Sequence, residues 1–116
     1  MIEHLNFEAF NIKVHDTKEK FPIKFLGKKP AVIDFYAEWC GPCKAMEPSF
    51  KKLSEEFEEV DFYKVNVDSE PLLSNLFSIR SIPTVVYIPL DQNKPILIKT
   101  GLMPEGAIRQ LLQEIL

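Results

Sequence analysis

Residues 31–44 read AVIDFYAEWCGPCK, so an apolar run leads directly into a pair of cysteines. The run Ala31–Ala37 is almost continuously apolar, which is typical of a strand buried on both faces of a sheet. Pro42 suits the first turn of a helix, where a backbone N–H has no intrahelical partner to lose. These residues predict a buried strand, a turn that carries Cys40 and Cys43, and a helix that begins beside them.

The segment after Cys43 has the periodicity of an amphipathic helix. Its apolar side chains recur in steps of three and four residues, and charged residues occupy the opposite face. The apolar stripe consists of Met46, Phe50, Leu53, Phe57 and Val60. Pro48 falls inside this helix, so we expect a kink there.

Two further strands and a short helix are predicted beyond this point. Phe62–Val67 and Thr84–Ile88 have the apolar composition of strands. Between them, Asp68 or Ser69 is expected to cap a short helix. The apolar residues of that helix are Leu72, Leu73, Leu76 and Phe77.

The C-terminal part of the chain supplies a hairpin and a last helix. A polar turn at 91–94 precedes a short strand, Ile96–Lys99, which we expect to pair with the strand before it. The last helix is expected from about Pro104. Helical crossovers between the earlier strands predict parallel pairing, whereas the hairpin predicts an antiparallel pair. The expected class is therefore α/β, with a central mixed β-sheet flanked by helices on both faces.

Residues 1–30 have the weakest pattern in the chain. Phe10–His15 is compatible with a strand, and the pattern of Ile23–Leu26 remains ambiguous. The sequence has no internal repeat and no linker. At 116 residues, we expect one domain over residues 1–116.

Composition limits the partners that this chain can have. The sequence holds 14 Lys and Arg against 17 Asp and Glu, a net charge of −3, without a basic cluster. This argues against nucleic acid or an anionic membrane as the main partner. The longest uncharged apolar stretch, Pro83–Leu90, is too short to span a bilayer. The first twenty residues carry acidic side chains and no compact apolar core, so we expect no signal peptide and a cytoplasmic protein.

Cys40 and Cys43 are the only cysteines, and their spacing indicates redox chemistry. A bridge between them would close too short a loop to add much stability. Zinc usually needs four ligands, and only the distant His4 and His15 remain, so we expect no metal. At a helix N-terminus, unpaired N–H groups and the helix dipole favour a thiolate. We expect Cys40 to face outward and attack a substrate disulfide, and the more buried Cys43 to resolve the mixed disulfide.

Asp34 is a carboxylic acid in the middle of the apolar strand. Burial of a carboxylate is costly, so desolvation should raise the pKa of Asp34. It is therefore a candidate acceptor for the proton of a buried thiol. Lys64 has a similar place in the neighbouring apolar strand and could be its partner.

The segment Asp34–Lys44 resembles the active-site segment of the thioredoxin family. Further similarities follow in order at Pro48, Tyr63–Asp68, Ile79–Thr84 and Gly101, so that the resemblance spans roughly residues 31–116. It implies the thioredoxin fold and the reduction of protein disulfides. It further implies that Cys40 is the nucleophile, that Cys43 is the resolving thiol, and that Asp34 moves its proton with Lys64 nearby.

The same resemblance implies a substrate groove beside the cysteines. Ile82-Pro83 would be a cis peptide bond held against the sulfurs, and the backbone of Ile82 would pair with a substrate strand. The expected rim consists of Trp39, Gly41, Pro42, Thr84 and Gly101. The chain departs from the family's pattern at Ser78, where Gly is usual, and over residues 1–30, which do not match the first strand and helix clearly.

The resemblance also implies partners. Electrons would come from NADPH through thioredoxin reductase, and the redox group would be the reversible Cys40–Cys43 disulfide with no bound cofactor. The chain itself has no Gly-x-Gly-x-x-Gly loop for a nucleotide. Other partners would be disulfide-containing client proteins, and we expect a monomer.

Two other functions are compatible with the same fold. A disulfide oxidant or isomerase would use the same cysteines, although Gly-Pro between them resembles the reducing enzymes. An interaction module would use the same groove without the redox step. Replacing both cysteines would separate binding from chemistry.

Overall fold

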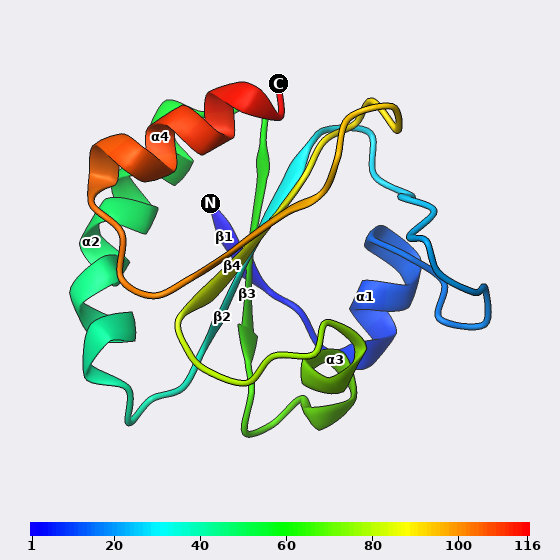
Figure 1. The fold of residues 1–116 in the computed structure, drawn as a ribbon, viewed down its shortest axis with the longest axis horizontal. Helices are drawn as coiled ribbons and strands as arrows, with labels where there is room; N and C mark the ends of the chain where they lie inside the picture. Colours follow the sequence, from blue (N-terminus) through cyan, green and yellow to red (C-terminus); the bar gives the residue numbers. More distant parts are fainter.

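The computed structural model describes all 116 residues, and a five-stranded sheet runs through its centre (Figure 1). The strands lie in the order β1-β3-β2-β4-β5. Their bounds are β1 Ile2–His4, β2 Ala31–Tyr36, β3 Asp61–Asn66, β4 Thr84–Ile88 and β5 Leu97–Thr100. Strand β3 is parallel to β1 and β2, β4 is antiparallel to β2, and β5 is antiparallel to β4. The predicted mixed sheet is confirmed.

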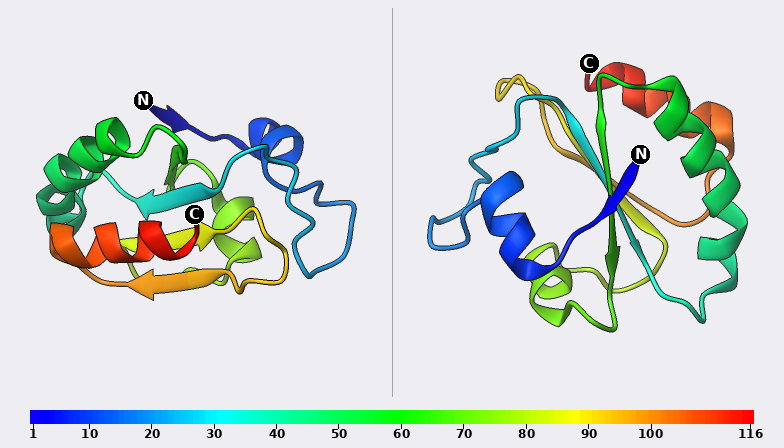
Figure 2. Two further views of the ribbon diagram at one scale, coloured as in Figure 1. Left: turned by 90° about the horizontal axis from the view of Figure 1, so that it is seen from above. Right: turned by 180° about the vertical axis from the view of Figure 1, so that it is seen from behind.

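Four helices cover the two faces of the sheet. They are α1 Phe7–Lys13, α2 Gly41–Glu56, α3 Pro71–Leu76 and α4 Glu105–Glu114. Helices α2 and α4 lie on one face, and α1 and α3 lie on the other (Figures 1 and 2). None of the four has the length and hydrophobicity that crossing a bilayer requires.

Each face of the sheet carries its own core. One core joins Val32 of β2 to Phe50 of α2 and Ile108 of α4. The other joins Ile33 of β2 to Phe10 of α1, together with residues of β3, α3 and β4. Alternate residues of a strand point to opposite faces, so β2 contributes to both cores. All six of its residues are buried, as the apolar run predicts.

The direction of β4 corrects one expectation. A helical crossover from β3 through α3 predicts that β4 runs parallel to β2 and β3, but β4 runs antiparallel to β2. Helix α3 has six residues and is therefore about 9 Å long. A strand of six residues is about 20 Å long. The helix is too short to carry the chain back along the sheet, so β4 starts at the end where β3 stops.

The N-terminal segment also differs from the expectation. The strand expected at Phe10–His15 is wrong, because helix α1 ends at Lys13 and a short strand, β1, precedes it. Asn6 caps the helix, and its side chain accepts the N–H of Ala9 at 2.8 Å. Phe10 and Val14, four residues apart, both turn into the core. The ambiguous segment Ile23–Leu26 forms no helix or strand.

The ends of two helices lie elsewhere than predicted. Helix α2 ends at Glu56, so the last member of its apolar stripe, Val60, is buried from the turn that follows. Helix α3 is capped by neither of the two predicted residues, since its N-cap is Glu70 and no side chain caps it. Only Leu73 of α3 is buried, and Leu72 is exposed.

Candidate active site

The two cysteines lie at the N-terminus of α2 and are joined by a disulfide. Cys40 is the N-cap residue, and its Sγ accepts a hydrogen bond from the backbone N–H of Cys43 at 3.2 Å. Pro42 stands in the first turn, as predicted. The strand that precedes the turn is held in the middle of the sheet, so the position of the cysteines is fixed by the core.

Cys40 does not face outward as expected. It is 3% exposed and Cys43 is 2% exposed, so the disulfide form buries both to the same extent. The two pack with Tyr36 and Ala37, and Ile82 lies against this group. In this form Cys40 Sγ is turned toward the helix and bonded to Cys43, which keeps it from solvent.

The loop before β4 brings the predicted groove residues together. The Ile82–Pro83 peptide is cis, as the resemblance implied. The carbonyl of Pro83 accepts a hydrogen bond from the N–H of Gly101 at 2.8 Å. Gly101 has a φ of +102°, a conformation that a side chain would strain. This contact attaches the cis-proline loop to the segment that follows β5.

Thr84 has a different place from the one expected. It is buried rather than at the rim, with 3% exposed. Its hydroxyl donates to the carbonyl of Ser81 at 2.6 Å and lies 3.2 Å from the hydroxyl of Thr100. The side chain therefore shapes the cis-proline loop from within and is not available to a substrate.

The exposed part of the predicted rim is formed by Trp39, Gly41 and Pro42. Trp39 is 72% exposed, a high value for so large an apolar side chain. Its Nε1–H donates to Asp68 Oδ2 at 2.8 Å, which fixes the orientation of the ring. Sequence reasoning gave Asp68 the role of a helix cap and missed this contact.

Asp34 is the buried acid of the site. It is 1% exposed, and its Oδ1 has no hydrogen-bond partner in the protein. Burial raises the pKa of Asp34 to about 7; the positive charge of Lys64 opposes the rise and the negative charge of Glu47 adds to it. The predicted direction of the shift is confirmed. An acid with a pKa near neutrality can both accept and release a proton under ordinary conditions.

Asp34 faces the same side of the sheet as the cysteines. Alternate residues of a strand share a face. Val32 belongs to the core under α2, and Tyr36 packs with Cys40 and Cys43. Asp34 lies between these two positions on β2, so its side chain is directed toward α2.

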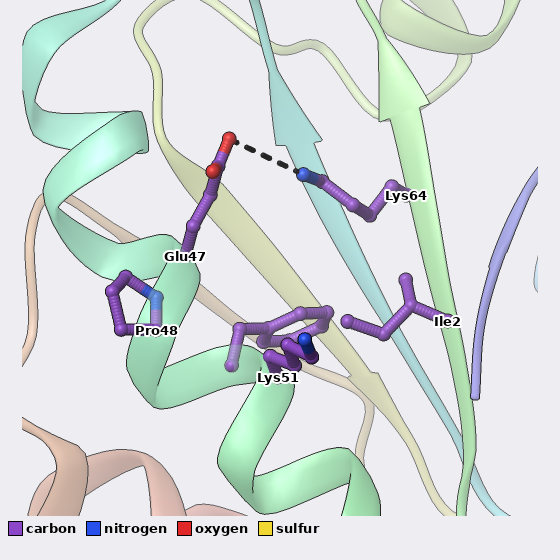
Figure 3. A pocket seen from close by; sticks show the side chains of 6 residues that line it. Ile2, Glu47, Pro48, Lys51 and Lys64 are labelled. Atoms are coloured by element: carbon purple, nitrogen blue, oxygen red, sulfur yellow. Dashed lines mark ion pairs between the residues drawn. The ribbon is translucent and has the colours of Figure 1, made fainter.

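Lys64 lies directly opposite Asp34 in the register of β2 and β3. Its ammonium does not form an ion pair with that carboxyl. Instead, Lys64 Nζ lies 3.7 Å from Glu47 Oε1 on α2 and 4.2 Å from the centre of the Tyr36 ring. Figure 3 shows the ion pair at the edge of a pocket of about 410 Å³ between α2 and the sheet.

Glu47 is a residue that sequence reasoning missed. A signal for it existed, because it follows Cys43 by four residues and side chains four apart share one face of a helix. Glu47 was not singled out because it lies beside Pro48, and because the other acidic residues of this helix face solvent. Only the structure shows that it meets Lys64.

The geometry supplies the parts of a thiol–disulfide exchange. A sulfur at a helix N-terminus is next to a backbone donor, a second sulfur lies within bonding distance, and a buried acid can hold a proton. No group of three or more His, Cys, Asp or Glu side chains is placed to hold a metal ion.

Comparison with known proteins identifies relatives along almost the whole chain. The family model for thioredoxin matches residues 4–114. A thioredoxin of Borreliella burgdorferi is 42% identical over 111 residues, which cover 95% of this chain and 93% of that protein. A thioredoxin of Mycoplasma pneumoniae is 41% identical over 90 residues, covering 78% and 86% of the two chains.

Solved structures agree with the sequence comparisons. The crystal structure of chloroplastic thioredoxin z superposes with a TM-score of 0.82 at 30% identity, covering 98% of this chain and 93% of the other. The thioredoxin of Malassezia sympodialis superposes with a TM-score of 0.76 at 28% identity, covering 100% and 92%. The arrangement of helices around the sheet is therefore shared with these proteins.

Proposed function

The chain belongs to the thioredoxin family and is a dithiol protein-disulfide reductase, and from this we propose that Cys40 is its nucleophile and Cys43 its resolving thiol. The observation that supports these roles most directly is the hydrogen bond from the Cys43 N–H to Cys40 Sγ. A backbone donor and the positive end of α2 stabilise a thiolate more than a thiol. Reduced Cys40 is thereby prepared for attack.

In the first step, the Cys40 thiolate attacks one sulfur of a substrate disulfide. A bond forms between Cys40 Sγ and that sulfur, and the substrate's S–S bond breaks. The other substrate sulfur leaves as a thiolate and takes a proton from solvent. The product is a mixed disulfide between Cys40 and the client protein.

In the second step, Cys43 resolves the mixed disulfide. The Asp34 carboxylate takes the proton of Cys43, and the resulting thiolate attacks Cys40 Sγ. The Cys40–Cys43 disulfide forms, and the second substrate sulfur leaves. Two electrons have then passed from the pair to the client, and Asp34 releases its proton to solvent. The raised pKa of Asp34, about 7, supports this role.

The client is proposed to bind across the cis-proline loop. The backbone of Ile82 would pair with an extended segment of the client next to the sulfurs. Exposed Trp39, Gly41 and Pro42 would contact the same segment, and Gly101 would line the far side. The packing of Ile82 against the cysteines supports this arrangement.

The oxidised pair must be reduced again after each cycle. Members of this family receive electrons from a reductase, and we propose that NADPH supplies them through thioredoxin reductase. We also propose a cytoplasmic location and a monomer. The Gly-Pro spacer, which resembles that of the reducing enzymes, supports a compartment that keeps thiols reduced. Cell fractionation tests the location.

We propose further that residues 1–116 form one domain. Phe10 and Val14 of the N-terminal segment share a core with Ile33 and Val65 of the central strands. Because these residues exclude water together, the N-terminal segment is expected to fold with the rest of the chain.

Serine variants of the two cysteines test the proposed roles. With insulin as the disulfide substrate and dithiothreitol as the reductant, we expect Cys40→Ser to fall to the rate of dithiothreitol alone. Cys43→Ser that has been reduced and then freed of dithiothreitol should instead accumulate a covalent complex with insulin, seen by non-reducing electrophoresis, because no second thiol resolves the mixed disulfide. A complex trapped by Cys40→Ser, with none trapped by Cys43→Ser, would contradict the assignment.

A further inference from the structure

The ion pair between Glu47 and Lys64 joins α2 to β3 beside the redox site (Figure 3). Glu47 stands one turn after Cys43, and Lys64 stands opposite Asp34 in the sheet. The Lys64 side chain is 13% exposed and the Glu47 side chain is 51% exposed. The pair therefore spans the boundary between the buried acid and solvent.

Lys64 has two carboxylates within its reach and is paired with only one of them. Its ammonium lies over the Tyr36 ring and 3.7 Å from Glu47. Asp34, the register partner of Lys64, has a buried oxygen with no hydrogen-bond donor. An ammonium free of Glu47 would gain by moving toward Asp34, since a buried carboxylate is stabilised by a nearby cation.

We propose that Glu47 is a positioning residue of the redox reaction, which holds the Lys64 ammonium away from Asp34 and so sets how readily Asp34 takes the proton of Cys43. The proposal rests on the proposed function for the role of Asp34. The placement of Lys64 between two carboxylates stands independently of that role.

The groups around Asp34 determine the direction of the effect. Lys64 faces it from β3, Glu47 from α2 and Tyr87 from β4, while Tyr36 shares its face of β2. Tyr87 is buried, and burial together with Asp34 raises the pKa of its hydroxyl, so it stays neutral. The charges that act on Asp34 are therefore those of Lys64 and Glu47.

Removal of the Glu47 charge lowers the pKa of Asp34 in two ways. The loss of a nearby anion lowers the proton affinity of Asp34 directly, and a released Lys64 lowers it further. We expect Glu47→Gln to lower the pKa of Asp34 by roughly half a unit to one unit, because Glu47 is half exposed and partly screened. Lys64→Gln should raise that pKa.

The experiment follows the carboxyl carbon of Asp34 by NMR from pH 4 to pH 9 in the oxidised protein at low salt. The variants are Glu47→Gln, Lys64→Gln and the double variant. Glu59→Gln is the matched control, because it removes the same charge from an exposed site beyond the end of α2. We expect Glu59→Gln to titrate like the wild type. Glu47→Gln should have a smaller effect when Lys64 is already absent.

Two results would overturn the inference. If Glu47→Gln titrates like Glu59→Gln, Glu47 has no influence on Asp34. If Glu47→Gln has the same effect with and without Lys64, it acts as a separate charge and positions nothing.

The pH profile of insulin reduction separates this inference from the proposed function. Its rising limb should move to lower pH in Glu47→Gln and stay in place in Glu59→Gln. If the wild type reduces insulin but Asp34 titrates in Glu47→Gln as it does in the wild type, only the positioning role is overturned. A wild type that fails to reduce insulin overturns the proposed function, and the titrations still decide whether Glu47 positions Lys64.

Discussion

At the scale of single residues, the burial of Asp34 costs stability when its carboxyl is charged, and the same burial suits this carboxyl to proton transfer. An ordinary aspartate is charged at neutral pH, but burial makes the charged form of Asp34 expensive and raises its pKa to about 7. Lys64 offsets only part of this effect, because its ammonium is paired with Glu47. The residue can therefore exchange a proton with a thiol at neutral pH.

The raised pKa predicts that Asp34→Asn stabilises the folded protein above neutral pH. The unfolded carboxyl titrates near 3.8 and the folded one near 7, so the wild type loses stability as the pH rises through this range. The variant avoids the loss, on the order of 4 kcal/mol when complete. Urea unfolding at pH 4 and pH 8 measures the difference.

The pH dependence distinguishes this effect from a simple change in packing. The advantage of Asp34→Asn should be small at pH 4 and reach its full size at pH 8, while the exposed variant Glu59→Gln should show no such trend. An advantage that is equal at the two pH values would count against a raised pKa.

At the scale of elements, the backbone is strained just after α3, where this chain has Ser78 in place of the usual Gly. Ser78 follows the helix with a φ of +54°, a conformation that favours glycine, and it stands where the thioredoxin family usually has Gly. The N–H of Ile79 bonds back to the carbonyl of Ser74 at 2.9 Å, which closes the helix end. The hydrogen bonds of this turn hold Ser78 in place.

Ser78→Gly is therefore expected to stabilise the protein by about 0.5–1 kcal/mol, since relief of the left-handed strain outweighs the added flexibility of the unfolded chain. Ser74→Gly is the matched control, and it should destabilise by about 1 kcal/mol because Ser74 lies inside α3. Thermal unfolding of both variants provides the measurement. Destabilisation of similar size by the two substitutions would refute the argument.

The elements also show what sequence patterns can predict. The run Ala31–Ala37 is almost continuously apolar and the stripe of α2 is long and regular, so composition predicts β2 and helical periodicity predicts α2. Helix α1 has only seven residues and a single fully buried side chain, so its sequence holds too few apolar positions to define a helical repeat. The direction of β4 depends on the length of α3, which capping signals did not define.

The site could be predicted only in part for a related reason. Cys40, Cys43 and Asp34 lie on one continuous segment, and local chemistry identifies them. The contacts of Glu47 with Lys64 and of Trp39 with Asp68 join residues distant in sequence. Their partners become evident only when β3 is placed next to β2. The burial of Cys40 could not be predicted either, because it depends on the disulfide and on Ile82 packing beside it.

At the scale of the whole molecule, the fold holds the redox site between a buried strand and exposed side chains. Two cores hold β2 from both faces, and the cysteines lie where β2 gives way to α2. The cis-proline loop and exposed Trp39 flank that point without covering it with another element. The exposed residues beside the cysteines are therefore positioned by the same two cores that hold β2.

The reduction potential of the Cys40–Cys43 pair tests the central claim most directly. It is measured by equilibrating the protein against a defined dithiol buffer and quantifying the disulfide. A disulfide reductase of this family should lie at or below about −250 mV, near the reference value of roughly −270 mV for thioredoxin itself. A potential above about −200 mV would contradict the claim and favour a disulfide oxidant or isomerase.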